Sequence, residues 1–405
     1  MKATTPEQEL LLLCGRTRLE EEGASRLRRL FEEVPVDWDA VLNAGARHAI
    51  TPLLHHHMAA EGQGRVPESV LQELRRRYLA IAARNLVLGR ELAALLGALE
   101  DAGAPAVAWK GPVLAAYVYP GPDLRSFHDL DIIVRRQDVA GVLEVLQERG
   151  YSAVPGRDLP DQERLRSAEQ DLTMENPETG ILVDVHWGRV QRYHSAAMDC
   201  EVLWGESEPM DLQGSTIRAL APDTLLLALA LHGAKHGPFP WPALKWVTDM
   251  EAFLRARGTD TRGEAWWKAI LERAHGLGCH RRLLLGLLLA GELLEAPIPP
   301  SVEADLRDET GLRALVPPIR DRLLASEPVD FSLGERLRFD LAVRERLRDR
   351  VRYRARRILI PGKRDLRTLP APLRFLQAPL RLLRLSGRYL LKPSRVRTLL
   401  SGDDR

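Results

Sequence analysis

Apolar residues recur at three-and-four spacing through much of the chain, a pattern typical of amphipathic helices. The longest such stretch runs from Glu68 to Ala102, and Gly103 with Pro105 is expected to end it. The same pattern returns after residue 221, where Pro and Asp in the opening turn predict a helix over Pro222 to His236. The sequence therefore predicts helical regions at both ends of a different central segment.

The central segment alternates short apolar runs with short amphipathic ones. The expected order is a strand, a helix, a strand, a helix and then a β-hairpin: Ala106–Trp109, Pro112–Tyr119, Leu130–Val134, Gln137–Arg149, and Asp171–Glu175 with Ile181–Trp187. Asn-Pro-Glu-Thr-Gly between the last two runs supplies the turn of the hairpin. This order predicts a small mixed α/β domain.

The predicted organisation has four parts. They are an N-terminal helical region at 1–85, an α/β core at 86–220, a helical domain at 221–340 and a basic amphipathic tail at 341–405. The fold class is α+β. A length of 405 residues allows two or three domains at about 100–200 residues each.

Composition and cysteine spacing indicate the cellular compartment that we expect for the protein. Three cysteines, Cys14, Cys200 and Cys279, lie far apart and form neither a disulfide framework nor a metal-binding spacing, which favours a reducing cytoplasm. No apolar run reaches the roughly 18–20 residues of a membrane span, and the N-terminus lacks the features of a signal peptide. A cytoplasmic protein with no transmembrane segment is expected.

The net charge of +2 hides an uneven distribution. Residues 341–405 contain 19 Lys and Arg against 5 Asp and Glu, a net +14, so the other residues contain 39 against 51, a net −12. The tail is predicted to pack as a helical face, or to bind an anionic partner. That partner would be a nucleic acid or an anionic membrane surface, since Leu and Ile are interleaved with Arg.

Two acids open the second predicted strand. Residues two apart share a face of a strand, so Asp129 and Asp131 point one way and Leu130 and Ile132 the other. Adjacent carboxylates are costly unless cations neutralise them, and Mg²⁺ suits carboxylates and phosphates together. The pair predicts a divalent-metal site for phosphoryl-type transfer, with a solvated strand end as the alternative.

The last predicted strand carries a third acid. Period two places Asp184 and His186 on one face, with Val183 and Val185 on the other. An acid between β-branched neighbours is explained if it is a metal ligand or a base that takes a proton from an attacking hydroxyl. A polar edge-strand face in water explains it equally well.

Other polar residues are candidates for binding phosphate. Lys110 can neutralise a triphosphate, and Gly111 permits a close approach of the backbone at the start of a helix. Arg125 is expected either to contact the triphosphate or to balance the carboxylates. His232 and His236 share a helix face, but no Glu follows His232, so packing is favoured over zinc.

The motifs, taken in order, carry a resemblance to a known family. They are Trp109-Lys110-Gly111, Arg125-Ser-Phe-His-Asp129-Leu-Asp131-Ile-Ile-Val, Val183-Asp184-Val185-His186-Trp187, Leu231-His232-Gly233-Ala234-Lys235-His236 and Leu244-Lys245-Trp246-Val247-Thr248-Asp249. The chain resembles the uncharacterised nucleotidyltransferase family of the DNA polymerase beta-like nucleotidyltransferase superfamily. The match covers roughly Leu86 to Leu254.

The resemblance implies a minimal nucleotidyltransferase fold, a small mixed sheet flanked by helices. It implies Asp129, Asp131 and Asp184 as catalytic metal ligands and Gly111 in the turn that faces the phosphates. Lys110, Arg125, His186 and Lys235 are assigned with Gly111 to nucleotide binding. The superfamily usually has Gly-Gly or Gly-Ser in this turn, whereas here Pro112 follows Gly111 and supplies neither a hydroxyl nor an N–H.

The function expected from this set is transfer of a nucleoside monophosphate from an NTP to an acceptor, with Mg²⁺ or Mn²⁺ as cofactor and release of pyrophosphate. The acceptor is left open among a small molecule, a peptide, a protein and an RNA. Two alternatives remain: a non-catalytic, antitoxin-like nucleotide-binding module, and a glycosyltransferase that uses Asp-x-Asp to bind a metal.

Overall fold

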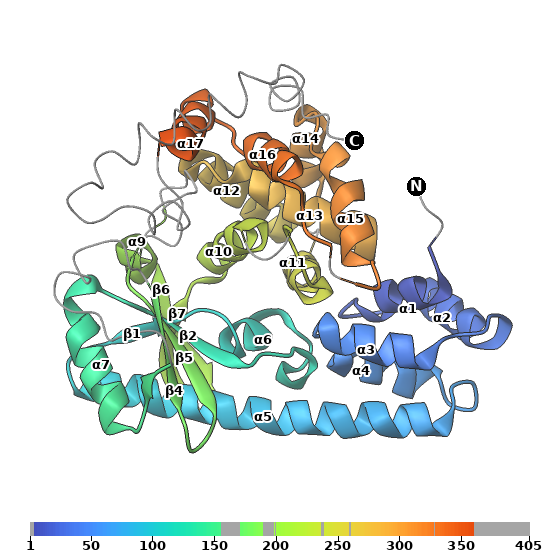
Figure 1. Ribbon diagram of the computed structural model, residues 1–405, viewed down its shortest axis with the longest axis horizontal. Coiled ribbons are helices and arrows are strands. Elements are labelled where there is room, and N and C mark those ends of the chain that lie inside the picture. The colour runs from blue at the N-terminus through green and yellow to red at the C-terminus, as the bar shows by residue number, and fades with distance from the viewer. Residues whose placement is uncertain are drawn as a thin grey trace, which may run out of the picture.

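The computed structural model describes residues 4–154, 171–188, 198, 200–235, 239–258, 261–327 and 329–359, without the side chains of 235, 261, 262, 333 and 355–359. A long helix, α5 (Glu68–Asp101), runs beneath the molecule in Figure 1. The sheet and α7 lie over one end of it, and the N-terminal helices lie at the other. The helices that follow the sheet form a third group above both. The predicted helical regions and mixed α/β segment, and hence the α+β class, are confirmed.

Helix α5 begins and ends close to the predicted residues. Leu88, Leu92, Leu95 and Leu99 follow three-and-four spacing and are buried. The helix ends because Gly103 adopts a φ of +70°, which lets Ala104 N–H donate to the Leu99 carbonyl at 2.9 Å. The helix is continuous across the predicted boundary between residues 85 and 86, so it joins the N-terminal region to the α/β core.

The sheet has seven strands in the order β3-β4-β5-β2-β1-β7-β6. Their bounds are β1 (Ala106–Ala108), β2 (Asp129–Val134), β3 (Ser152–Ala153), β4 (Asp171–Asn176), β5 (Ile181–His186), β6 (Ser207–Leu212) and β7 (Ser215–Leu220). Strand β2 pairs with β5 in parallel and with β1 in antiparallel orientation, so it is central and flanked on both sides. The β4–β5 hairpin is antiparallel, as predicted.

The hairpin β6–β7 is absent from the predicted order. It extends the sheet beyond β1, with which β7 pairs in parallel. The two strands are joined by Gln213 and Gly214, which both have positive φ, +54° and +82°. A two-residue loop of this kind matches the right-handed twist of a hairpin, and Gly214 is the part of this signal that the sequence displays.

Helices cover the sheet and form the two helical regions. The N-terminal ones are α1 (Pro6–Cys14), α2 (Glu21–Glu33), α3 (Trp38–Arg47) and α4 (Thr51–Glu61). Those of the core are α6 (Pro112–Val118), α7 (Val139–Glu148) and α9 (Cys200–Gly205), with short 3-10 turns at Pro122–Leu124 and Arg136–Asp138. The later ones are α10 (Pro222–Lys235), α11 (Leu244–Arg257), α12 (Thr261–Leu277), α13 (His280–Leu294), α14 (Pro300–Asp308), α15 (Val316–Leu323), α16 (Leu333–Ala342) and α17 (Leu347–Leu359), with a 3-10 turn at Arg313–Leu315.

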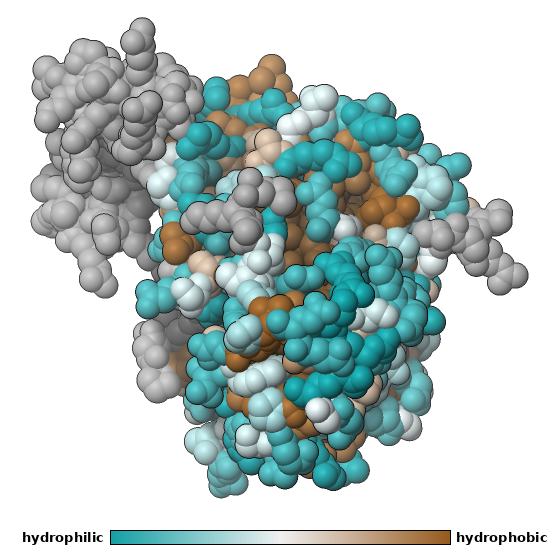
Figure 2. All heavy atoms as spheres, turned by 90° about the vertical axis from the view of Figure 1, so that its right-hand side faces the viewer, coloured by the Kyte–Doolittle hydropathy of each residue, from teal (hydrophilic) through white to brown (hydrophobic). Residues whose placement is uncertain are grey.

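The buried apolar side chains form one continuous core through all three groups of elements. The face on the right of Figure 1 is mainly hydrophilic, with smaller hydrophobic areas between the polar ones (Figure 2). The side chains of Cys14, Cys200 and Cys279 are all buried. Among the described helices, none has both the length and the apolar character that crossing a membrane requires.

Candidate metal and nucleotide site

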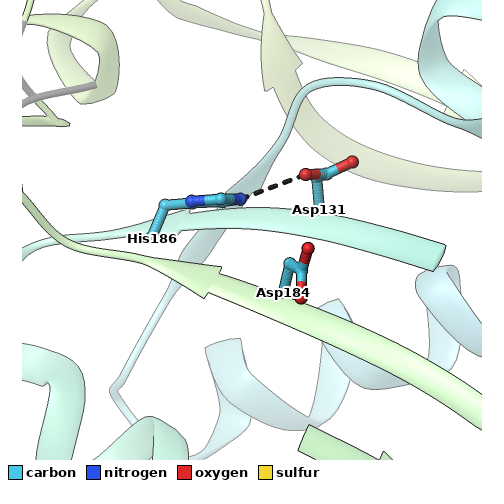
Figure 3. Close-up of side chains that lie close together, drawn as sticks. All are labelled: Asp131, Asp184 and His186. Atoms are coloured by element: carbon cyan, nitrogen blue, oxygen red, sulfur yellow. Dashed lines mark hydrogen bonds and ion pairs between the residues drawn. The ribbon is translucent and has the colours of Figure 1, made fainter. Parts of the chain in front are cut away.

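The candidate site lies on two neighbouring parallel strands, β2 and β5. Their register places Asp131 directly opposite Asp184, and Asp129 opposite Leu182. Paired residues on adjacent strands point to the same side of a sheet, so the two acids face one another. In β5, Val183 and Val185 are buried while Asp184 and His186 are partly exposed, as period two predicts. Figure 3 shows the three polar side chains coming together from the two strands.

The carboxylate of Asp131 lies at the centre of this group. Its side chain is only 4% exposed, and its Oδ1 accepts hydrogen bonds from Lys110 Nζ and from His186 Nε2, each at 3.0 Å. Burial alone would raise the pKa of this carboxyl, but the positive charge of Lys110 and the contact with His186 outweigh burial and lower it well below its usual range. Asp131 is therefore ionised and held by two donors.

Asp184 has a contrasting environment. Burial, aided by the negative charges of Asp131 and Asp129, raises its pKa above the usual value, while a hydrogen bond from Thr173 opposes this rise. Thr173 Oγ1 donates to Asp184 Oδ1 at 2.6 Å from the neighbouring strand β4. The two facing acids thus differ: the charge of Asp131 is balanced by Lys110, and Asp184 is destabilised as an anion.

The ligand atoms of Asp131, Asp184 and His186 all lie within 4.8 Å of one another. Among the described residues, Asp129 is not part of this group. Its charge nevertheless acts on Asp184, because it raises the pKa of that carboxyl. Two of the three predicted metal ligands, Asp131 and Asp184, therefore lie close together. The third member of the group is His186. Two carboxylates and an imidazole form a donor set that suits a divalent cation.

The turn after β1 brings Lys110 to the acids. Gly111 has a φ of +49°, and a Cβ placed on it would lie 3.3 Å from the Asp129 carbonyl oxygen, so the position suits glycine. Pro112 is the first residue of α6, as predicted. Lys110 Nζ lies 3.9 Å from the centre of the Trp109 ring. The turn thus directs a lysine, predicted to neutralise a triphosphate, at Asp131.

Arg125 has another partner. Its Nε and Nη2 donate to the two carboxylate oxygens of Asp249 at 2.8 and 2.9 Å, and Tyr119 donates to the same carboxylate at 2.7 Å. The arginine and aspartate side chains are 5% and 3% exposed. Arg125 therefore joins α11 to the segment that enters β2, while its role in nucleotide binding stays a prediction.

Helices α10 and α11 contact the segments that carry the site residues. The ring of His232 lies between Trp109 and Trp246, at 6.0 and 4.9 Å between ring centres. His236 and the side chain of Lys235 lie outside the described residues, so the predicted phosphate contact of Lys235 stays a prediction.

Two polar residues, Thr173 and Lys245, lie near the acids, and the sequence alone assigned neither of them a role in the site. Thr173 lies in β4 directly opposite Asp184, and only this strand pairing shows that its hydroxyl contacts the acid. Lys245 donates to the Ser126 carbonyl at 3.4 Å, and burial together with the positive charge of Arg125 lowers its pKa to about 8. Lys245 and Asp249 lie four residues apart on α11, and Asp249 pairs with Arg125.

The sheet is open and mixed, its parallel strands β2 and β5 bring two acids together, and the turn after β1 adds a lysine. These are the features expected of a nucleotidyltransferase core. Comparison with family models matches residues 34–295 to the family described as "Uncharacterised nucleotidyltransferase", and the chain belongs to this family. Comparisons with curated proteins and with solved structures give no match. The resemblance noted from the motifs is confirmed.

Proposed function

We propose that this protein transfers a nucleoside monophosphate from an NTP to an acceptor hydroxyl or phosphate. The single observation that carries the proposal is the in-register pairing of Asp131 with Asp184 beside Lys110. An acceptor oxygen would bond to the α-phosphorus while the bond from that phosphorus to the bridging oxygen breaks, and pyrophosphate would leave.

The residues of the site suit distinct parts of this reaction. Asp131 and Asp184 would hold a divalent cation, Mg²⁺ or Mn²⁺, with Asp129 beside them. When bound, the cation would neutralise charge on the phosphoryl oxygens. The ammonium group of Lys110 lies beside Asp131. With a nucleotide bound next to the cation, it would pair with a phosphate oxygen in place of Asp131. Asp184, whose pKa is raised, is suited to take the proton of an acceptor hydroxyl.

The test uses the full chain with each α-labelled NTP, Mg²⁺ or Mn²⁺, and host lysate. We expect one component of the lysate to become labelled and pyrophosphate to be released. Asp131→Ala should abolish both, while Glu178→Gln, which changes an exposed acid in the β4–β5 turn, should not. NTP binding without pyrophosphate release for any acceptor would contradict the enzyme and favour the non-catalytic module. Stabilisation by a UDP-sugar rather than an NTP would favour the glycosyltransferase.

We also infer that the basic tail binds an anionic partner in the cytoplasm. Leu347 and Val351 of α17 are 73% and 56% exposed, one helical turn apart, and arginines lie between them. The tail beyond residue 359 lies outside the described residues. Removing the residues after Arg350 should weaken binding to RNA or to anionic liposomes. If neither binding changes, the tail has only a structural role.

A further inference from the structure

The distance between two candidate ligand atoms matches the geometry of one metal ion. His186 Nε2 and Asp131 Oδ1 lie 3.0 Å apart (Figure 3). Two ligands at right angles on an octahedral ion, each bonded at about 2.1 Å, are separated by about 3.0 Å. Opposite ligands are separated by about 4.2 Å on the same basis. Because all three ligand atoms lie within 4.8 Å of one another, small side-chain movements would bring them to one ion.

The position of the His186 ring is constrained from two sides. The ring belongs to β5, whose residues are in register with the central strand β2. It also meets the buried indole of Trp109 edge-on, with ring centres 5.8 Å apart and an angle of 82° between the planes. A ligand on a rigid strand, held by a packed neighbour, needs little ordering when a metal binds.

We propose that His186 is a metal ligand through Nε2, together with Asp131 and Asp184, and that this nitrogen donor makes the site select Mn²⁺ over Mg²⁺. The proposal rests on the metal site of the proposed function and specifies its third ligand. Mg²⁺ prefers oxygen ligands and keeps several waters, whereas imidazole binds transition metals well. An all-carboxylate set of Asp129, Asp131 and Asp184 would discriminate less between the two ions, because carboxylate oxygens suit both.

Metal binding requires one change in the contacts of Asp131. Nε2 must present its lone pair, so its hydrogen bond to Asp131 Oδ1 is replaced by shared coordination. Lys110 holds the same oxygen at 3.0 Å and becomes available for a phosphate. The competing arrangement keeps Nε2–H on Asp131, with His186 outside the coordination shell. The two arrangements differ in whether nitrogen is bonded to the metal.

The experiment detects that bond directly. The full chain, stripped with EDTA, is loaded with Mn²⁺ with and without tripolyphosphate, which contains no nitrogen. Pulsed electron paramagnetic resonance should show nitrogen coupling to Mn²⁺, and ¹⁵N-labelled histidine should change its signature. His186→Asn should remove the coupling and lower Mn²⁺ affinity at least about tenfold, the lower end of the loss seen for outer-shell partners. Mg²⁺ affinity, measured by competition, should fall less.

The matched control is His232→Asn. His232 also contacts Trp109 but is not part of the metal group, so this variant should keep the coupling. Bound Mn²⁺ without nitrogen coupling would overturn the role of His186 and leave the proposed function standing. Equal affinity for Mn²⁺ and Mg²⁺ would overturn the selectivity. Failure of Mn²⁺ to bind under either condition would overturn both this proposal and the metal-dependent part of the proposed function.

Discussion

Amide substitutions at the two facing acids should have opposite effects on stability. In the metal-free protein, Asp131 is stabilised as an anion by Lys110 and His186. Asp184 is destabilised as an anion by burial and by the charge of Asp131, so its pKa is raised. Asp131→Asn should therefore lower the free energy of unfolding at neutral pH, whereas Asp184→Asn should raise it. Both variants should lose nucleotidyl transfer.

The magnitudes follow from what each substitution leaves behind. Asp131→Asn leaves the Lys110 ammonium, 13% exposed, without its counter-charge, and loss of one partner of a buried pair costs about 3 kcal/mol or more. Asp184→Asn keeps an oxygen that can accept the Thr173 hydrogen bond and removes a repelled charge. Replacements of this kind at strained functional sites commonly stabilise a protein by about 0.5–2 kcal/mol.

The pH dependence has a definite sign for each acid. Because the pKa of Asp184 is raised, the native state binds more protons than the unfolded state between the ordinary and raised values, and stability falls as pH rises through this window. Because the pKa of Asp131 is lowered, its contribution is present above the ordinary value and is lost on acidification. The deficit of Asp131→Asn should therefore shrink toward low pH, and the gain of Asp184→Asn should also shrink.

Thermal and urea unfolding in EDTA, from about pH 2 to pH 7, measures both effects, because the window of Asp184 lies above the ordinary Asp value near 3.9 and that of Asp131 lies below it. Glu178→Gln is the matched control, because this exposed carboxyl should change stability by less than about 0.5 kcal/mol. Shifts of the same sign for Asp131→Asn and Asp184→Asn at pH 7 would refute the electrostatic reasoning.

Two further predictions concern the frame of the site. Arg125→Met and Asp249→Leu should each lower the free energy of unfolding in urea by about 3–5 kcal/mol, because each leaves a buried charge unpaired. The double variant leaves no unpaired charge and should lose less than the sum of the two, so additive losses would contradict this. Gly111→Ala should cost about 1 kcal/mol or more and reduce activity, because φ is +49° and the new Cβ meets the Asp129 carbonyl. Gly214→Ala, with φ at +82° and no atom within 4 Å, should show a similar cost and retain activity.

Local pattern predicted the strands and the orientation of their side chains, because period two is a property of a single segment. It placed Asp184 and His186 on one face of β5 and the acids at the start of β2, as the structure has them. The parallel pairing that sets Asp131 against Asp184 depends on contacts between segments far apart in the chain, which no local pattern contains. The β6–β7 hairpin was missed because β6 has a single buried residue, Leu212, and so lacks the alternating apolar pattern that marks β5.

The partners of the cationic residues were less predictable than the strands, because a cation pairs with whichever anion the tertiary structure places beside it. Lys110 was expected to neutralise a triphosphate, and it lies against Asp131. Arg125 was expected at the triphosphate or beside the paired acids, and it binds Asp249, which lies 124 positions away in the chain. The chemistry of these side chains was clear from the sequence, but their partners required the tertiary structure.

The N-terminal helices contribute to the site through α11. Thr248 on this helix donates to the Gly15 carbonyl at 2.7 Å, so α11 is fixed to the N-terminal region. One residue further on, Asp249 holds Arg125 in a buried ion pair. Arg125 lies four residues before Asp129, where β2 begins, so a chain of contacts leads from the N-terminal helices to the strand that carries Asp131. Rigid support of this kind lets charged groups stay in place before substrate binds.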